Sequence, residues 1–178
     1  MKPKLLMVIC FFAAMAMIPL LCVNAGKPKR NGGSDKLSET DLCSVVCNYC
    51  RNDYCDSAID AVSCIIRTNS KCGKRYNGKD NSDKELYHRV KKIFNSNSEL
   101  LYQKSSVSSI PFAPCSNGST IAEGKQSSVA SPWDCFSSRY DPKNRCTGIS
   151  LDGVDYLCKN GFSKEEAIKW YIPEAEIK

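Results

Sequence analysis

Six cysteines lie close together between Leu42 and Cys72, and they are the side chains in this sequence with the clearest potential for chemistry. Three of them are spaced at i, i+4 and i+7, which puts their sulfurs on one stripe of an α-helix. Clustered thiols form disulfides, bind metals or carry out redox reactions. The six are Cys43, Cys47, Cys50, Cys55, Cys64 and Cys72, and four more follow at Cys115, Cys135, Cys146 and Cys158.

The first 25 residues help to choose among these uses. Lys2 and Lys4 precede an apolar run from Leu5 to Val23, and a small residue stands at Ala25. We therefore expect residues 1–25 to be a cleaved secretory signal peptide. A membrane anchor is the alternative, because the run approaches the ~20 residues that span a bilayer. Pro19 and the absence of a basic block directly after Ala25 favour cleavage.

Cleavage would remove Cys10 and Cys22 and leave ten cysteines, an even number. In a secreted chain this predicts five disulfides, although the spacing does not say which residues pair. The C-x-x-C formed by Cys47 and Cys50 is also compatible with a redox pair or half of a zinc site. It lies in a predicted helix without a second C-x-x-C, so structural disulfides are favoured.

Other catalytic patterns are weak. His88 is the only histidine, and no G-x-S-x-G motif accompanies it. Two pairs of carboxylates, Glu165 with Glu166 and Asp152 with Asp155, could serve a glycosidase, but helix caps explain them more simply. We therefore predict no catalytic, metal or cofactor-binding residues, and we expect a binding protein rather than an enzyme. A small secreted hydrolase that uses carboxylates, with an unidentified substrate, is the alternative.

The charge does not indicate nucleic acid as a partner. The net charge of +6 falls to +4 when the two lysines of the leader are removed, and the basic residues are spread along the chain. Nucleic-acid binders usually concentrate them on one face. No other apolar run is long enough to cross a membrane, so no span is expected after cleavage.

Helical spacing and caps predict five helices. In the N-terminal half we expect them at about 38–50, from Tyr54 onward, and at about 84–94 behind a cap at Ser82 or Asp83, with 99–103 as an extension. In the C-terminal half we expect a short helix over 150–158. A capping box at Ser163 and Glu166 starts a last helix, with Phe162 and Trp170 available for packing. No strand shows sustained alternation.

These elements predict a mainly α, small disulfide-rich helical protein. After a flexible basic arm (26–37) we expect an N-terminal lobe (38–103), a Ser/Pro-rich loop or hinge (104–132) and a C-terminal lobe (133–178). Six cysteines in the first lobe and four in the loop and second lobe would allow two helical lobes, each with its own disulfides. The loop contains the sequon Asn117-Gly118-Ser119, a candidate glycosylation site.

Tyrosines adjoin several cysteines, and this layout resembles the BICYCLE family of secreted cysteine-rich aphid salivary gall effectors, named for paired Cys-Tyr-Cys motifs. Cys47, Tyr49 and Cys50 would form the first motif. Cys146, Tyr156 and Cys158 would form the second. The resemblance implies delivery in saliva into a host and action there by binding.

The sequence thus predicts a secreted, extracellular, disulfide-stabilised effector or toxin-like protein. We expect it to act by binding a protein partner, in a host or outside the producing cell. The identity of that partner is not readable from the residues.

Overall fold

The helices of the N-terminal half begin and end close to the predicted positions. The computed structural model describes residues 39–76, 83–121, 128–143 and 145–178. Helices α2 (Glu39–Tyr49), α3 (Asp56–Lys71) and α4 (Lys84–Ser96) confirm the three predicted helices. The Asp83 side chain caps α4 by accepting a hydrogen bond from the Leu86 amide at 3.0 Å. The predicted signal peptide and basic arm lie outside the described residues.

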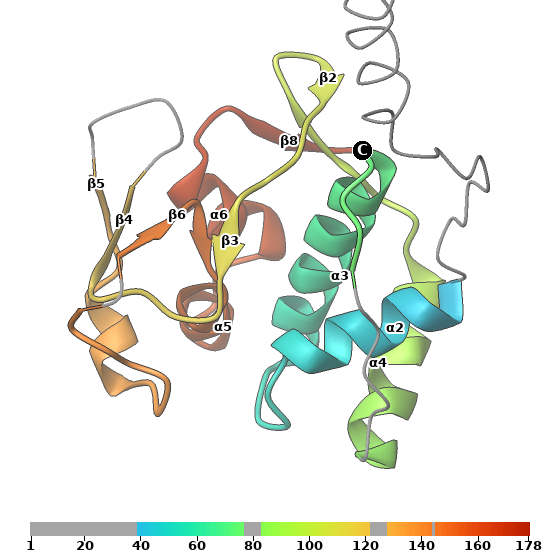
Figure 1. The fold of residues 1–178 in the computed structure, drawn as a ribbon, viewed down its shortest axis with the longest axis horizontal. Helices are drawn as coiled ribbons and strands as arrows, with labels where there is room; N and C mark the ends of the chain where they lie inside the picture. The colour runs from blue at the N-terminus through green and yellow to red at the C-terminus, as the bar shows by residue number, and fades with distance from the viewer. Residues whose placement is uncertain (1–38, 77–82, 122–127, 144) are drawn as a thin grey trace, which may run out of the picture. The chain divides into compact units, whose positions relative to one another are not determined.

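Helix α3 is the centre of the fold. In Figure 1 it stands between α2 and α4 on one side and the C-terminal helices on the other, and it contacts all of them. A helix that is covered on all sides needs apolar residues around its whole circumference rather than along one stripe. This one has them: the apolar residues of α3 that are buried are Ala58, Ile59, Ala61, Val62, Cys64, Ile65 and Ile66.

Three buried polar side chains of α3 find hydrogen-bond partners, as burial requires. Asn69 donates to the Ile110 carbonyl at 2.8 Å and accepts from the Ile110 amide at 2.6 Å, so its amide group acts like a strand neighbour for that residue. Thr68 accepts from the Leu101 amide at 2.9 Å. Ser63 donates to the Ile59 carbonyl at 2.8 Å. Asn69 and Thr68 thereby fix two backbone segments outside the helices.

The predicted absence of strands is wrong. Among the residues that the structure describes, eight strands of two or three residues form three small sheets, in the orders β2-β1-β8, β3-β7 and β5-β4-β6. The expected helical extension over 99–103 is instead strand β1. The strands are β1 (Leu101–Gln103), β2 (Ser106–Val107), β3 (Phe112–Ala113), β4 (Ser119–Ile121), β5 (Ser128–Ala130), β6 (Cys146–Thr147), β7 (Ile149–Ser150) and β8 (Ala175–Ile177).

Most of these strands pair with partners distant in the sequence. Leu101 pairs with Ile177, Phe112 with Ile149 and Thr120 with Cys146, the last two in parallel. The expected Ser-rich loop therefore contains four strands, two of which, β3 and β4, pair directly with strands of the C-terminal part of the chain. Strands this short cannot show an alternating pattern, which is why the sequence did not reveal them.

The C-terminal helices agree with their predicted caps. Helix α5 (Leu151–Lys159) starts at Ser150, whose side chain accepts from the Gly153 amide at 3.2 Å. Helix α6 (Lys164–Tyr171) starts with the complete capping box of Ser163 and Glu166. A 3₁₀ helix, η1 (Pro132–Phe136), precedes them and was not predicted.

The mainly α fold class must be corrected to mixed α/β. Of the described residues, 48% are helical and 16% lie in strands.

The ten cysteines after residue 42 are all described, and no disulfide joins them in this structure. The described residues also belong to one compact unit rather than two helical lobes. The Lys164 ammonium of α6, for example, lies 2.6 Å from the Asp60 carboxylate of α3.

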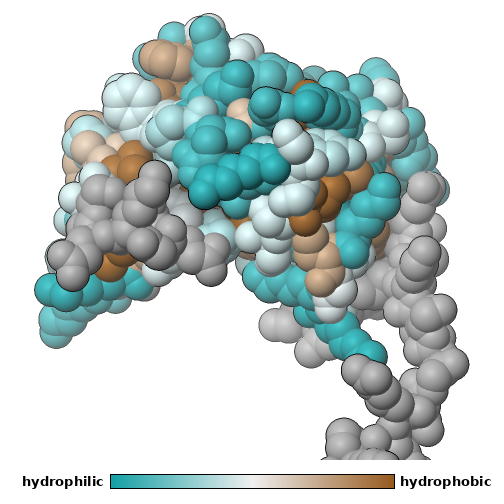
Figure 2. Space-filling model, turned by 90° about the horizontal axis from the view of Figure 1, so that it is seen from above, coloured by the Kyte–Doolittle hydropathy of each residue, from teal (hydrophilic) through white to brown (hydrophobic). Residues whose placement is uncertain are grey.

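The surface carries hydrophobic residues in small groups. Figure 2 shows this for one face, where they are scattered among hydrophilic side chains. In the part of the chain that the structure describes, no helix combines the length and apolar character that crossing a membrane requires.

The buried amide of Asn69 gives a direct test of this arrangement. Asn69→Ala should lower the free energy of unfolding by about 2 to 4 kcal/mol, because two backbone groups of Ile110 lose their buried partner. Urea denaturation measures the change. Asn48→Ala on the exposed face of α2 is the matched control and should change stability by no more than about 0.5 kcal/mol. Equal effects of the two substitutions would contradict the role assigned to Asn69.

Candidate functional site

Four aromatic side chains from three elements come together beside one shallow pocket. Trp133 and Phe136 belong to η1, Tyr156 to α5 and Trp170 to α6. We call these four residues the aromatic surface. The first three line a pocket of about 150 Å³, and Trp170 packs against Trp133.

The geometry of the aromatic surface is well defined. The Trp133 and Tyr156 rings are stacked, with centroids 5.4 Å apart and planes at 4°. The Trp170 ring is tilted against Trp133 at 5.3 Å, and its indole N–H donates to the Ala130 carbonyl at 2.8 Å. Phe136 makes no comparable arrangement and is 82% exposed. Water therefore reaches a set of rings of which three are already held in place.

The close approach of η1 to α5 depends on a glycine. A Cβ atom at Gly153 would lie 1.9 Å from the Tyr171 hydroxyl and 2.8 Å from the Trp133 indole nitrogen. The Tyr171 hydroxyl is buried and hydrogen-bonded to Ser131 at 2.7 Å. The missing side chain at Gly153 thus lets Trp133 lie over the first turns of α5, where it meets Tyr156.

Asp152, which lines the pocket and is buried, forms an ion pair with the half-buried Arg139. The Asp152 carboxylate accepts hydrogen bonds from the Arg139 guanidinium, with Nε at 2.9 Å, from Ser137 at 2.5 Å and from the Tyr54 hydroxyl at 2.6 Å. Arg139 also donates to the Tyr49 carbonyl at 3.0 Å. This network joins the turn before α3 to η1 and α5.

The electrostatics keep Asp152 ionised. Burial acts to raise the pKa of its carboxyl group, but the hydrogen bonds from Arg139, Ser137 and Tyr54 outweigh burial and hold that pKa below its ordinary value. An ionised carboxylate cannot donate a proton, and its lone pairs are already occupied. Asp152 is therefore poorly suited to be the acid or the base of a hydrolase.

Asp155 lines the same pocket and is similarly engaged. Its carboxylate accepts from the Cys55 amide at 2.9 Å and lies 2.6 Å from the Lys159 ammonium. Asp53 and Arg51, which are 2.8 Å apart, complete the rim. The structure thus brings the predicted pair Asp152 and Asp155 together, but within ion pairs. The other predicted pair contributes to a helix cap, because Glu166 accepts from the Ser163 amide at 2.8 Å.

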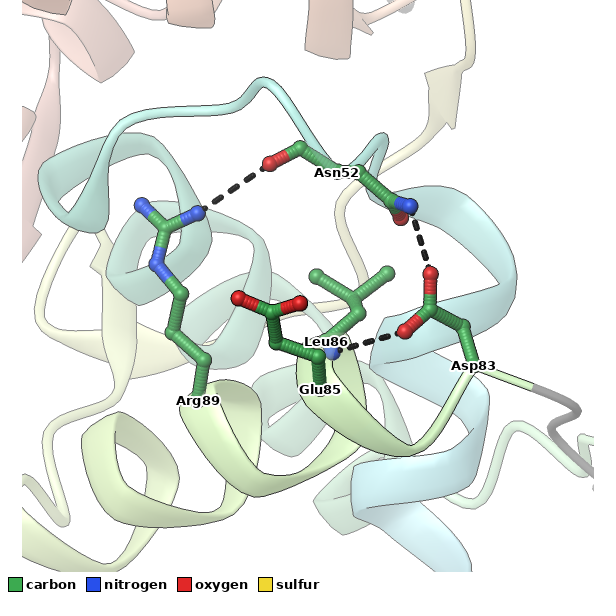
Figure 3. A pocket seen from close by; sticks show the side chains of 5 residues that line it. All are labelled: Asn52, Asp83, Glu85, Leu86 and Arg89. Atoms are coloured by element: carbon green, nitrogen blue, oxygen red, sulfur yellow. Dashed lines mark hydrogen bonds between the residues drawn. The ribbon is translucent and has the colours of Figure 1, made fainter.

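A second pocket, of about 130 Å³, lies between the turn before α3 and the start of α4 (Figure 3). Its polar groups bond one another: Asn52 donates to the Asp83 carboxylate, and Arg89 donates to the Asn52 carbonyl at 3.2 Å. Asp83 also caps α4. Because Asn52, Asp83 and Arg89 are committed to holding this turn against α4, we regard the second pocket as structural.

The C-x-x-C thiols lie in surroundings that do not suit redox or metal chemistry. Cys47 is near the end of α2, Cys50 follows the helix, and both are buried. Burial, followed by the neighbouring Cys43, raises the pKa of the Cys47 thiol to about 12. Burial also raises the pKa of Cys50. The reactive form of cysteine is the thiolate, which is scarce at such values.

The remaining cysteines are spread over the fold. Cys55 and Cys158 meet where α3 begins, and Cys115 and Cys146 both lie near Asp134. Cys64 is buried, and its thiol donates to the Glu99 carbonyl at 3.5 Å. The two that are exposed are Cys72 and Cys135.

Two other predicted residues lie away from the aromatic surface. His88 is exposed on α4, with its ring 6.3 Å from that of Tyr87. Asn117 is half-buried, and its side-chain amide donates to the Pro142 carbonyl at 3.5 Å, so its glycosylation stays a prediction. Within the described ranges, no three histidine, cysteine or acidic side chains gather closely enough to hold a metal ion.

Sequence reasoning missed most of this site. Trp170 and Phe162 were expected to pack inside, but they are 42% and 40% exposed. Trp133 and Phe136 stand in a Ser- and Pro-containing stretch without apolar periodicity. Aromatic residues outside any periodic apolar pattern could have indicated that these two side chains lie at the surface. Nothing in the sequence connects Arg139 with Asp152, because their pairing depends on the tertiary fold.

The buried ion pair predicts a specific loss of stability. Arg139→Met should lower the free energy of unfolding at pH 7 by about 3 kcal/mol, because Asp152, whose side chain is 6% exposed, would be left without its cation. Urea denaturation of both proteins measures the difference. Arg145→Met, at an exposed arginine nearby, is the control and should stay within about 0.5 kcal/mol of wild type.

The same variant should respond to pH in a defined direction. The folded-state pKa of Asp152 is depressed, so its stabilising contribution is present above the unfolded pKa of about 3.9 and is lost as pH falls through the folded value. The difference between wild type and Arg139→Met should therefore narrow below about pH 4. A difference that is equal at pH 7 and pH 3 would show that Arg139 acts through its bond to the Tyr49 carbonyl instead.

Comparison with known proteins identifies no relative of this chain. Neither a scan against protein-family models nor a search of curated proteins found a match for the chain. The resemblance to the BICYCLE family, which comes from the spacing of cysteines and tyrosines, stays a prediction.

Proposed function

We propose that this is a secreted protein that acts by binding a protein partner through the aromatic surface. The observation that carries the proposal is the 82% exposure of Phe136 beside the stacked rings of Trp133 and Tyr156. A group of exposed apolar side chains on a protein surface often marks an interaction site. Tyrosine, tryptophan and phenylalanine are also enriched in the cores of protein interfaces.

The composition around the rings fits an interface. The charged side chains of Arg51, Asp53 and Lys159 border the pocket beside the rings, and polar groups at the border are typical of a protein interface. Binding here would order few side chains, since stacking and the Trp170 hydrogen bond already restrict three of the rings. A surface that is arranged before binding loses less conformational entropy when the partner arrives.

Secretion is the second part of the proposal. It is supported by the leader-like residues 1–25 and by an even number of cysteines after them. The resemblance to the BICYCLE family would place the partner in a host, after delivery in saliva. The partner bound by the aromatic surface would then be a host protein.

The alternative of a secreted hydrolase has less support. All three carboxylates of the pocket are held in ion pairs: Asp152 by Arg139, Asp155 by Lys159 and Asp53 by Arg51. A glycosidase needs one carboxyl group that is protonated and a second that is free to attack or to activate water. Hydrolysis would require at least one of these carboxyl groups to leave its ion pair, whereas binding through the aromatic surface would not.

The test compares two exposed phenylalanines. Wild-type protein, Phe136→Ala and Phe162→Ala are each used to capture proteins from the proposed target tissue. Phe162 is 40% exposed and does not line the pocket, so it controls for nonspecific hydrophobic capture. The expected partner is retained by wild type and Phe162→Ala and lost by Phe136→Ala.

Titration with the purified partner then gives the magnitude. Removing a side chain at the centre of an interface typically costs about 2 kcal/mol or more of binding free energy. Phe136→Ala should therefore raise Kd by about 30-fold. Phe162→Ala should leave Kd within about twofold. A partner that binds Phe136→Ala as tightly as wild type uses another surface, and that result would overturn the proposal.

A further inference from the structure

Two half-buried cysteines that are far apart in the sequence meet where α3 begins. Cys55 is the N-cap residue of α3, and its backbone amide donates to the Asp155 carboxylate of α5 at 2.9 Å, across 100 positions of sequence. Cys158 lies three residues after Asp155. Residues three apart on a helix share a face, so Cys158 is on the side of α5 that is turned toward Cys55.

Polar contacts fix this part of α5 against the turn before α3. One turn earlier, the Tyr54 hydroxyl donates to Asp152 at 2.6 Å. One residue after Cys158, the Lys159 ammonium lies 2.6 Å from the Asp155 carboxylate and 3.8 Å from that of Asp53. Cys158 lies between these contacts, and after burial the neighbouring Cys55 is the next cause that raises the pKa of its thiol.

We propose that Cys55 and Cys158 form a disulfide that joins the start of α3 to the end of α5. In forming it, the two thiols lose two protons and two electrons and gain one sulfur–sulfur bond. The electrons pass by thiol–disulfide exchange, during folding and before the thiols are buried, to a disulfide oxidant such as oxidised glutathione, which is reduced to two thiols. This assigns one pairing among the ten cysteines, and it is a bond between the two halves of the chain.

The pairing changes how the protein resists unfolding. A disulfide restricts the unfolded chain more when it closes a longer loop, by an amount that grows with the logarithm of the loop length, and this loop is long. A disulfide between neighbouring cysteines, such as Cys43 and Cys47 within α2, would close a loop of only about one helical turn. The Cys55–Cys158 bond would instead hold the N-terminal helices and α5 together after a break in the intervening backbone.

The direct test is a disulfide map of the full chain, secreted from eukaryotic cells or refolded in a glutathione buffer. Alkylation is carried out in denaturant without reductant, since burial raises the pKa of the Cys158 thiol to about 12 and would slow its labelling in the native state. Cleavage before aspartates and after lysines then gives the peptides Asp53–Cys55 and Asp155–Lys159, each with one cysteine. They should be recovered as one linked species that separates on reduction.

Single variants test the pair independently of the map. Cys55→Ser should expose one alkylatable thiol at position 158, and Cys158→Ser should expose one at position 55. Each variant should also lower Tm on the order of 10 °C, as expected for opening a long disulfide loop. Cys72→Ser, at an exposed cysteine, is the control and should leave both positions unlabelled.

A cut in the backbone gives a third readout, which does not require a cysteine variant. The two-residue turn at Lys104 and Ser105 is exposed and joins β1 to β2, so a protease site placed there separates the halves. The fragments should stay joined in denaturant until reductant is added. Recovery of the Asp155–Lys159 peptide in alkylated form, or linked to any cysteine other than Cys55, would overturn the proposal.

Discussion

The burial of α3 on nearly all sides is the constraint on which the rest of the structure depends. An isolated helix of this kind would expose a complete ring of apolar residues, so every other element has to cover part of it. Helices α2 and α4 cover one side, while α5, α6 and β1 cover the remainder. The polar side chains of Thr68 and Asn69 are buried in the same process and bond backbone groups of the covering segments. Burial of apolar surface thus brings the elements together. The side chains of Thr68 and Asn69 then fix the positions of the backbone at Leu101 and Ile110.

The sequence was informative wherever structure is local. Helix caps at Asp83, Ser150 and Ser163 act within three residues, and all three helices begin where the caps predict. The strands were invisible because each has two or three residues and most take their register from a partner far along the chain, as Phe112 does from Ile149. The expectation of two lobes failed for the same reason. Contacts such as Lys164 with Asp60 have no signature in local composition.

The candidate site shows a similar division. Its individual members are readable as aromatic or charged residues, and the pair Asp152 and Asp155 could be identified from spacing alone. Their role could not be identified, because it depends on Arg139 and Lys159 neutralising them in the folded state. The aromatic surface was missed because Trp133 and Trp170, which are distant in sequence, meet only when η1 packs over α5 and α6. A glycine at position 153 is required for that packing, but in the sequence it looks like any other small residue.

The pairing of β8 with β1 bears on the order of events during synthesis. Residues 101–103 leave the ribosome well before residues 175–177, yet they take their strand partner from them, and the Leu100 and Lys178 backbones exchange two further hydrogen bonds of 2.8 and 3.0 Å. Helices α2, α3 and α4 can form early from local contacts, whereas the first sheet cannot be completed until residues 175–178 have been made. Until then the apolar side of α3 that faces β1 and α6 stays uncovered. The growing chain therefore passes through a period in which its central helix is partly open to chaperones and to misassembly with other copies.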